Sequence, residues 1–322
     1  MADQPGWGEG APHADEDALI ARLAELVDGP AVDVLRGIGD DAALLAPDLV
    51  WTVDTQVEGV HFDRATSSPA DVGWKALAVN LSDLAAMGAT PVAALVSVIL
   101  GEGDDAELEA VYAGLGACAR TYDCAVAGGD IARGAGLALS ISVLGRARHA
   151  PGRAGARPGD VIAVTGTLGE SAAGLAVLRD PTLRDLPGAE ECVERHRRPH
   201  PRLADGKRLA AAAHAMMDLS DGLATDLPRL ARRSGVALTV DLDALPMHED
   251  VRAIAAALGH EPGAFAATGG EDYELLVALP AEAVGACGVP LTVIGAVTAG
   301  AAGVRFAGAG ADGALRGWDH LA

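Results

Sequence analysis

Aromatic residues are scarce in this chain of 322 residues, because Phe, Trp and Tyr together make up only 3%. Ala, Val and Leu must therefore build most of the hydrophobic core. Half of the residues are hydrophobic and 21% are charged, so the composition excludes a disordered chain and allows a sizeable core. The length suggests two domains or one large one.

Basic residues are also few, with 24 Lys and Arg against 45 Asp and Glu and a net charge of −21. Nucleic acid is not expected as a partner, because proteins meet a phosphate backbone with clustered Lys and Arg. The basic cluster at residues 195–198 is too short to change this, although it is sufficient for one small anionic ligand. The many carboxylates suit a divalent metal ion, which would let an acidic protein bind phosphates.

Cysteines and long apolar runs are equally limited. The four cysteines form no CxxC pair and no zinc-ligand spacing, so we expect reduced thiols in a cytoplasmic protein. The N-terminus lacks the basic and apolar regions of a signal peptide. The best apolar run, residues 91–100, has half the length that a membrane-spanning helix needs, so no membrane association is expected.

Several catalytic and nucleotide-binding motifs are missing. The sequence has no Gly-x-x-x-x-Gly-Lys-Ser/Thr loop, no Gly-x-Gly-x-x-Gly after a predicted strand and no Gly-x-Ser-x-Gly elbow. The turn at residues 37–42 lacks the third glycine of the dinucleotide fingerprint. P-loop, dinucleotide-binding and serine hydrolase folds therefore lose their main support.

Strand-like and helix-like segments alternate along the chain, which predicts an α/β (α+β) layered protein. We expect a disordered tail at 1–14, two domains at 15–148 and 149–322, and a crossing between them at 145–159, where Arg, Gly and Pro gather. The predicted strands are 49–54, 91–100 (buried), 124–127, 137–144, 160–165, 216–219, 236–241, 273–279 and 291–297. The predicted helices are one capped by Asp15, then 69–87, 104–122, 170–178, 202–213, 222–232 and one near 249–258, with an irregular stretch at 180–200.

Acidic residues recur where apolar segments end, beside Gly or Ser. Any one of them is often only a helix cap or a turn residue. Six such groups in one chain, at junctions that collect along a sheet edge, predict carboxylates that converge. Converging carboxylates repel one another unless a cation holds them, and hard oxygen ligands favour Mg²⁺. The groups lie at 39–41, 53–55, 81–83, 128–130, 218–221 and 269–272.

Two further features are candidates for function, each with a structural alternative. Asn80 and Asp83 share one face of the predicted helix 69–87, opposite an apolar face. We regard functional and structural roles for this pair as equally open. His61 stands between two hydrophobic residues, and a lone histidine is more often structural or exposed.

Segments in order along the chain resemble the thiamine-monophosphate kinase family. The long block 75–89 and the block 269–275, Gly-Gly-Glu-Asp-Tyr-Glu-Leu, are the specific ones. The others are 37–44, 54–55 with 61–62, 128–130, 158–160, 164–166 and 218–222. The resemblance implies an aminoimidazole ribonucleotide synthetase-like fold of two domains. By this resemblance the N-terminal domain would bind ATP and form a homodimer by joining mixed sheets, and a C-terminal α/β domain would follow.

The resemblance also implies several Mg²⁺ ions, ATP as co-substrate and thiamine monophosphate as acceptor. Positions that match metal ligands are Asp41, Thr52, Val53 (through its main-chain oxygen, since a hydroxyl residue is common there), Asp54, Asp83, Asp130, Asp218 and Asp221. Positions that match nucleotide contacts are Tyr112, Gly129, Asp130, Arg153 and Ser220. Positions that match the surroundings of thiamine phosphate are His61, Glu271 and Trp318.

This chemistry needs no catalytic base. A phosphate monoester has a second pKa of about 6, so it is mostly anionic at neutral pH and can attack the γ-phosphorus of ATP directly. It needs relief from the repulsion between two polyanions and correct positioning.

Other functions stay open at this point. A selenophosphate synthetase would carry a reactive cysteine near its N-terminus, whereas the first cysteine here is Cys118. A related hydrogenase-maturation protein would end in a cysteine-bearing tail, whereas this chain ends Asp-His-Leu-Ala. A non-catalytic Mg²⁺- or nucleotide-binding regulator would have no reason to keep His61, Glu271 and Trp318.

Overall fold

The computed structural model describes residues 16–27, 33–101, 103–311 and 313–318. The tail predicted at 1–14 and the predicted cap Asp15 lie outside these residues. The first predicted helix is present as α1 (Glu16–Leu26), which belongs to a separate unit of the chain and is described by itself. Among the described helices, none combines the length and apolar composition that crossing a bilayer requires.

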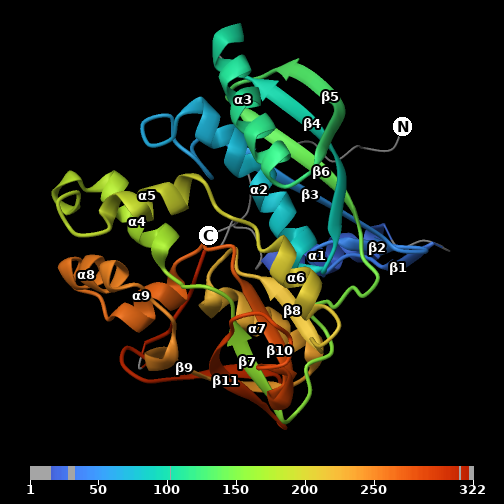
Figure 1. The fold of residues 1–322 in the computed structure, drawn as a ribbon, viewed down its shortest axis with the longest axis vertical. Coiled ribbons are helices and arrows are strands. Elements are labelled where there is room, and N and C mark those ends of the chain that lie inside the picture. The colour runs from blue at the N-terminus through green and yellow to red at the C-terminus, as the bar shows by residue number, and fades with distance from the viewer. Residues whose placement is uncertain (1–15, 28–32, 102, 312, 319–322) are drawn as a thin grey trace, which may run out of the picture. The chain divides into compact units, whose positions relative to one another are not determined.

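A six-stranded sheet forms the first half of residues 33–318, in the order β1-β2-β3-β6-β4-β5 (Figure 1). Strand β6 is antiparallel to both β3 and β4, whereas β4 and β5 are parallel. Helices α2 (Pro69–Ala86) and α3 (Asp105–Thr121) bury one face of the sheet in a common apolar core. The strands are β1 (Val34–Arg36), β2 (Ala43–Leu45), β3 (Leu49–Val57), β4 (Thr90–Leu100), β5 (Ala125–Arg133) and β6 (Ala138–Arg146).

The sequence around α2 explains where this helix begins and how closely it packs. The Ser68 side chain accepts the Asp71 backbone N–H, and the Asp71 carboxylate accepts the Ser68 backbone N–H, which is a capping box. Gly73 permits a close approach between α2 and α3, because a Cβ there would lie 1.9 Å from the Val111 carbonyl oxygen. These contacts fix α2 against the sheet.

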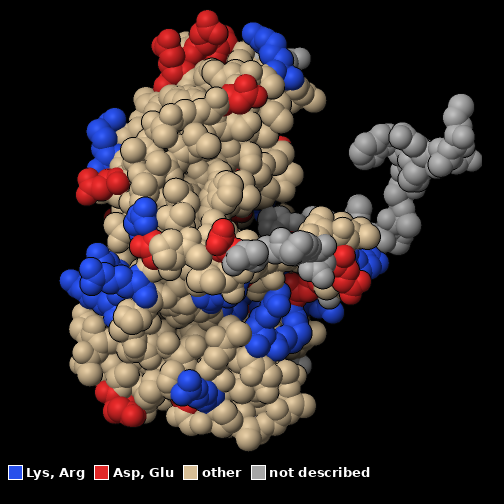
Figure 2. Space-filling view, turned by 90° about the vertical axis from the view of Figure 1, so that its right-hand side faces the viewer, with Lys and Arg blue, Asp and Glu red and all other residues tan. Residues whose placement is uncertain are grey.

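The prediction that residues 91–100 form a buried strand is only half right. Strand β4 exists, but its two faces differ: Val96 and Val98 are fully buried, whereas Leu95 is 53% exposed. Since α2 and α3 cover only one face of the sheet, the apolar side chains on the other face remain accessible. Figure 2 views the molecule from the β4–β5 side of Figure 1 and shows few charged side chains across the middle of its upper half.

The second half contains another six-stranded sheet, in the order β12-β9-β11-β7-β10-β8. Helix α7 packs on one face of this sheet, and α6 packs on the other. The strands are β7 (Asp160–Val164), β8 (Ala215–Asp218), β9 (Ala237–Asp241), β10 (Leu275–Pro280), β11 (Thr292–Thr298) and β12 (Gly303–Ala307). The helices are α4 (Glu170–Arg179), α5 (Ala189–Arg197), α6 (Leu203–Leu209), α7 (Leu223–Ser234), α8 (Glu249–Ala257) and α9 (Pro262–Thr268), with 3-10 turns η1 (Pro181–Leu183), η2 (Leu242–Ala244) and η3 (Ala281–Ala283).

Helix α2 contacts both halves. Its last residues, Ala85 and Ala86, share an apolar cluster with Met216 and Leu275 of the second sheet. A Cβ at Gly206 of α6 would lie only 2.0 Å from the Ala85 carbonyl oxygen. The C-terminal end of α2 therefore lies where the two sheets meet, and its polar side chains reach that junction.

The chain passes from the first sheet to the second between the end of β6 and the start of β7, within the segment predicted to make this crossing. We propose 15–148 and 149–322 as the domain limits. The prediction of an irregular stretch at 180–200 is wrong, because η1 and α5 lie there. Strands β1, β2 and β12 and helix α9 were also not predicted. These elements are short, and α5 is rich in charge, so local apolar periodicity does not reveal them.

Candidate metal and phosphate site

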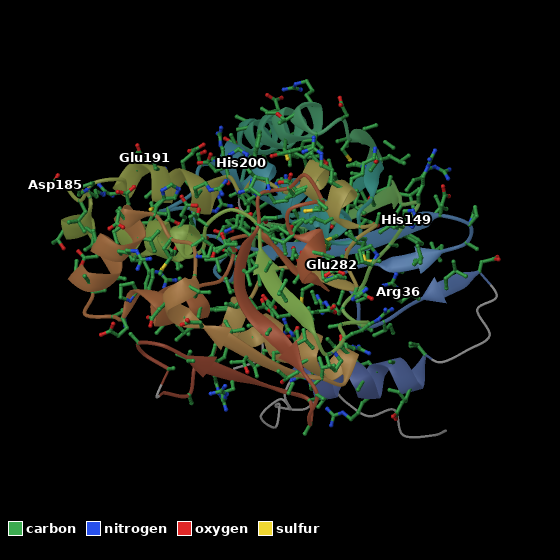
Figure 3. All side chains as sticks on the ribbon, turned by 60° about the horizontal axis from the view of Figure 1, so that its bottom comes forward. Arg36, His149, Asp185, Glu191, His200 and Glu282 are labelled. Atoms are coloured by element: carbon green, nitrogen blue, oxygen red, sulfur yellow. The ribbon has the colours of Figure 1, made fainter. Side chains whose placement is uncertain are left out.

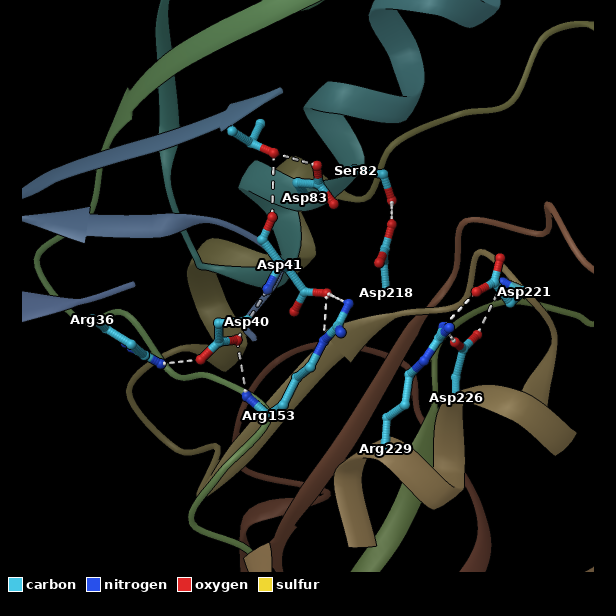
Figure 4. Close-up of polar contacts among 11 residues, drawn as sticks. Arg36, Asp40, Asp41, Ser82, Asp83, Arg153, Asp218, Asp221, Asp226 and Arg229 are labelled. Carbon is cyan, nitrogen blue, oxygen red and sulfur yellow. Dashed lines mark hydrogen bonds and ion pairs between the residues drawn. The ribbon is translucent and has the colours of Figure 1, made fainter. Parts of the chain in front are cut away.

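Three carboxylates from distant parts of the sequence meet at the junction of the two sheets. Asp41 precedes β2, Asp83 lies near the end of α2, and Asp218 is the last residue of β8. One oxygen from each lies within 4.8 Å of the others (Figure 4). Asp41 and Asp218 are buried. The predicted convergence of acids on a sheet edge is therefore confirmed for these three.

Each carboxylate in this cluster has a partner that fixes its orientation. Thr52 Oγ1 donates to Asp83 Oδ2 at 2.6 Å, and Ser82 Oγ donates to Asp218 Oδ2 at 2.6 Å. Arg153, in the crossing segment, donates from Nη2 and Nε to Asp41 Oδ1 at 2.6 and 3.0 Å.

The second oxygen of Asp41, Oδ2, is buried and has no hydrogen-bond partner in the described part of the chain. The cluster thus presents an unpaired, hard oxygen donor together with two further carboxylates. This donor set fits a divalent cation such as Mg²⁺.

Burial raises the pKa values of all three acids, and neighbouring carboxylates add to this effect. Burial, opposed by Arg153 and supported by the charge of Asp218, raises the pKa of Asp41 to about 7. Burial likewise raises the pKa of Asp218 to about 6, although the Ser82 hydroxyl and Arg153 oppose it. Burial, then the charges of Asp54 and Asp218, raise the pKa of Asp83 well above its ordinary value. A bound cation would replace the shared protons in this cluster.

The predicted polar face of α2 is confirmed, and its two members have different contacts. Asn80 is fully buried, and its Oδ1 accepts the Asp54 backbone N–H at 2.9 Å, whereas Asp83 reaches Thr52. Both residues thus bind α2 to β3. Asp54 is exposed at the edge of the site, yet desolvation by its surroundings and then the charge of Asp221 raise its pKa to about 6.

Asp221 lies beside a second polar group that sequence reasoning missed. Arg229 of α7 donates from Nη1 to the Asp221 carboxylate, and the same atom lies 3.1 Å from Asp226 Oδ1 (Figure 4). Asp226 is fully buried and accepts the Asp221 backbone N–H at 3.2 Å. One turn of α7 therefore fixes both the backbone and the side chain of Asp221. The spacing of 226 and 229, i and i+3 on one helix, was the available sequence signal.

Two of the residues predicted to bind substrate bond to the backbone of the turn at 218–221. Glu271 donates its backbone N–H to the Ser220 carbonyl at 2.7 Å, and Trp318 donates its own to the Asp221 carbonyl at 2.8 Å. The indole-bearing residue Trp318 is 48% exposed. His61 accepts the Val57 backbone N–H at its Nδ1, which anchors the loop that follows β3. The backbone of Trp318 is thus held at the turn that follows Asp218, and the residue is accessible there.

Four further predicted site residues lie on the first sheet and on helix α3. Val53 of β3 is 62% exposed. Its apolar side chain offers no ligand atom, so the predicted role concerns its main-chain oxygen alone. Asp130 is exposed on β5. Gly129 has a packing reason to be glycine, because a Cβ there would lie 1.8 Å from the Val96 carbonyl oxygen. Tyr112, on α3, packs against the first core. Their ligand roles stay predictions.

Comparison with known proteins places this geometry in a family. Residues 39–147 match the domain described as AIR synthase related protein, N-terminal domain, and residues 157–307 match the corresponding C-terminal domain. The thiamine-monophosphate kinase of Salmonella typhimurium is 42% identical over 327 aligned positions, which cover 95% of this chain and 98% of that protein. The chain belongs to the thiamine-monophosphate kinase family.

Other members and structures agree with this assignment. The family member from Bacillus subtilis is 38% identical, with 81% of this chain and 82% of that protein covered. A solved structure described as "AaThiL complexed with AMPPCP and TMP" has a TM-score of 0.88 and 34% identity, covering 98% of this chain and 100% of that one. A hydrogenase-maturation protein in complex with ATP shares the fold, with a TM-score of 0.68 at 23% identity over 93% of this chain and 90% of that one. The expected two-domain fold of the thiamine-monophosphate kinase family is therefore confirmed.

Proposed function

We propose that this protein transfers the γ-phosphoryl group of ATP to thiamine monophosphate, producing ADP and thiamine diphosphate. The observation that carries the proposal is the convergence of Asp41, Asp83 and Asp218 in a member of the thiamine-monophosphate kinase family. The relative whose structure is described with AMPPCP, an ATP analogue, and TMP supports the same pair of substrates.

Mg²⁺ is the proposed metal. Asp41, Asp83 and Asp218 would hold it, because they bring hard oxygen atoms together, and one Asp41 oxygen has no hydrogen-bond partner among the residues that the structure describes. Asp54, Asp130, Asp221, Thr52 and the Val53 carbonyl complete the proposed ligand set. When bound, Mg²⁺ would neutralise charge on the phosphates of two substrates that repel one another.

The chain's own residues position the reactants rather than move protons. The acceptor phosphate is already mostly anionic at neutral pH, so it needs no base, and transfer proceeds in line from ATP. Thr52 and Ser82 hold the carboxylates of Asp83 and Asp218 in place. Arg153, now paired with Asp41, carries a guanidinium that suits a phosphate group of the nucleotide.

The two substrates occupy different sets of proposed contacts. His61, Glu271 and Trp318 would bind the thiamine half, in which the Trp318 ring can stack on the cationic thiazolium. The proposed nucleotide contacts are Tyr112, Gly129, Asp130, Arg153 and Ser220.

The test is turnover by the purified protein with ATP, Mg²⁺ and thiamine monophosphate, in which ADP and thiamine diphosphate are quantified together by chromatography. We expect the two products in equal amounts, and no ADP when unphosphorylated thiamine replaces the monophosphate. The Asp218→Asn variant is the matched control and should form neither product. Release of ADP without thiamine diphosphate would contradict the proposal.

We further propose a cytoplasmic homodimer formed through the outer face of the first sheet. This face exposes Trp51, Leu95, Ile99 and Ile131, each between 44% and 59%. Exposed apolar patches of this kind mark interfaces between proteins. Sedimentation of the wild type should give a dimer, and Ile131→Arg should give a monomer; a wild-type monomer at micromolar concentration would refute the interface. The four cysteines form no disulfide with one another in the structure, and reduced thiols are typical of cytoplasmic proteins.

A further inference from the structure

Lysine is almost absent from this protein, and one of its two lysines is buried beside the proposed substrate site. Of the 24 basic residues other than histidine, only Lys75 and Lys207 are lysines. Lys207 is exposed, whereas the Lys75 side chain is only 5% exposed. Burying an ammonium group costs free energy unless the charge is paired and hydrogen-bonded. The pairing of Lys75 is therefore informative.

The partner of Lys75 is Glu271. Lys75, on α2 in the first half of the chain, donates from Nζ to Glu271 Oε2 at 2.7 Å. His196 Nδ1 of α5 lies 3.4 Å from the same oxygen. Burial and then the charge of Lys75 lower the pKa of His196 to about 4, so this histidine is neutral near pH 7. Lys75 is thus the cation that balances Glu271.

The contacts leave the other carboxylate oxygen of Glu271 for a ligand. In the described part of the chain no donor reaches Oε1, and the Glu271 side chain is 25% exposed. Lys75 therefore fixes the Glu271 carboxylate through Oε2. Oε1 is left to accept a hydrogen bond from a bound ligand.

The backbone at Glu271 supplies independent support. Glu271 has a φ of +67°, in the left-handed region that side chains rarely adopt. Such a conformation is unfavourable for a residue with a side chain and is found mainly at functional sites, where surrounding contacts hold it. Here the Glu271 backbone N–H bonds to the Ser220 carbonyl, next to the acidic cluster. The strain thus serves to present the side chain of Glu271.

We propose that Lys75 is a positioning residue that aims Glu271 Oε1 at the cationic, amino-bearing heteroaromatic half of the acceptor substrate. This inference rests on the proposed function and assigns a residue to the same site. Lys75 then determines affinity for thiamine monophosphate and not for ATP. A purely structural ion pair between the two halves of the chain would instead affect only folding stability.

The experiment measures binding of thiamine monophosphate by titration calorimetry without ATP, and the KM values for both substrates in turnover. Lys75→Met should weaken thiamine monophosphate binding at least about tenfold, because it leaves the Glu271 carboxylate without the cation that orients it. The KM for ATP should change less than about twofold, because Lys75 is not among the proposed nucleotide contacts. Lys75→Arg keeps the cation and should retain more affinity than Lys75→Met. The matched control Lys207→Met should behave as the wild type.

A second arm asks whether Lys75 acts through Glu271. Adding Lys75→Met to Glu271→Gln should change binding of thiamine monophosphate by less than about twofold, because the carboxylate it positions is already gone. This double variant has no unpaired buried charge, so it also guards against loss of folding in Lys75→Met. The proposal would be overturned if the losses of affinity in Lys75→Met and Glu271→Gln multiplied in the double variant. It would also be overturned if Lys75→Met bound thiamine monophosphate normally and only its Tm fell.

The wild-type arm separates the two proposals. Wild-type turnover of thiamine monophosphate with an unaffected Lys75→Met variant refutes the role of Lys75 alone. A wild type that neither binds nor phosphorylates thiamine monophosphate refutes the proposed function, and the role of Lys75 with it.

Discussion

Replacing Asp83 by Asn should stabilise the metal-free protein at alkaline pH and abolish its response to Mg²⁺. Burial and the neighbouring charges raise the pKa of Asp83 well above its ordinary value. A carboxylic acid with a raised folded-state pKa favours folding below its ordinary pKa, and this contribution is lost as pH rises through the raised value. The ionised Asp83 side chain therefore costs folding free energy that an asparagine avoids.

The size of the effect follows from the geometry. At an effective dielectric constant of about 20, two unit charges 4.8 Å apart repel by about 3.5 kcal/mol. Arg153 offsets the charge of Asp41, while the charges of Asp54 and Asp218 remain. We therefore take one such repulsion, reduced by solvent screening, as the order of magnitude. A gain of about 1–3 kcal/mol at pH 9 corresponds to about 2–6 °C in Tm for a protein of this size. The gain should be smaller at pH 6 than at pH 9, because a raised pKa keeps more of Asp83 protonated at the lower pH, and protonated Asp83 resembles asparagine.

The assay is thermal unfolding followed by circular dichroism, in chelator and in excess Mg²⁺, at pH 6 and pH 9. The wild type should gain Tm with Mg²⁺, and Asp83→Asn should not. Asp185→Asn is the matched control, since Asp185 is exposed in the loop between η1 and α5 and its side chain points away from the ribbon (Figure 3). A variant that is less stable than the wild type in chelator at pH 9, or that keeps the full Mg²⁺ shift, would refute the reasoning.

Three further outcomes are expected. Trp318→Ala should raise the KM for thiamine monophosphate about tenfold, since desolvated cation–π contacts reach about 2 kcal/mol; a lower Tm with both KM values unchanged would make Trp318 a structural anchor. Burial raises the pKa of Asp272 from 3.8 to about 7, so wild-type stability to urea should fall as pH rises through this window, by at most about 1.4 kcal/mol per pH unit, whereas Asp272→Asn should lack this component; equal slopes would contradict it. If the substrate phosphate is its own nucleophile, kcat/KM should fall on the acid side near pH 6, and a shift of a full pH unit in His61→Gln would instead make His61 the base.

The acidic groups show how far the sequence alone leads. It indicated that carboxylates at segment ends would converge, and Asp41, Asp83 and Asp218 do so. It did not separate them from Asp272, whose carboxylate accepts the backbone N–H groups of Gly169 and Ser171 at the start of α4. The difference depends on which segments the two sheets bring together. Local patterns carry no information on that packing.

The missed residues have the same explanation. Lys75 and Glu271 are 196 positions apart, and the partners of Arg229 become evident only once α7 packs beside the turn at 218–221. The exposed face of β4 was predicted as buried for a related reason. An apolar sequence does not show whether a helix of the same chain or a second protein covers the strand. Asn80 and Asp83, by contrast, lie three positions apart on one helix, so their shared face was predictable from spacing.

Helix α2 sets a fixed distance between the residues proposed to act at the two ends of the substrate. Lys75, which holds Glu271, and Asp83, in the acidic cluster, are eight residues apart on this helix, or about 12 Å along its axis. A rigid spacing of this kind selects ligands by length. Under the proposed function, an analogue with a longer linker between its thiazolium ring and its phosphate would have to leave one end out of register, however well each end binds separately.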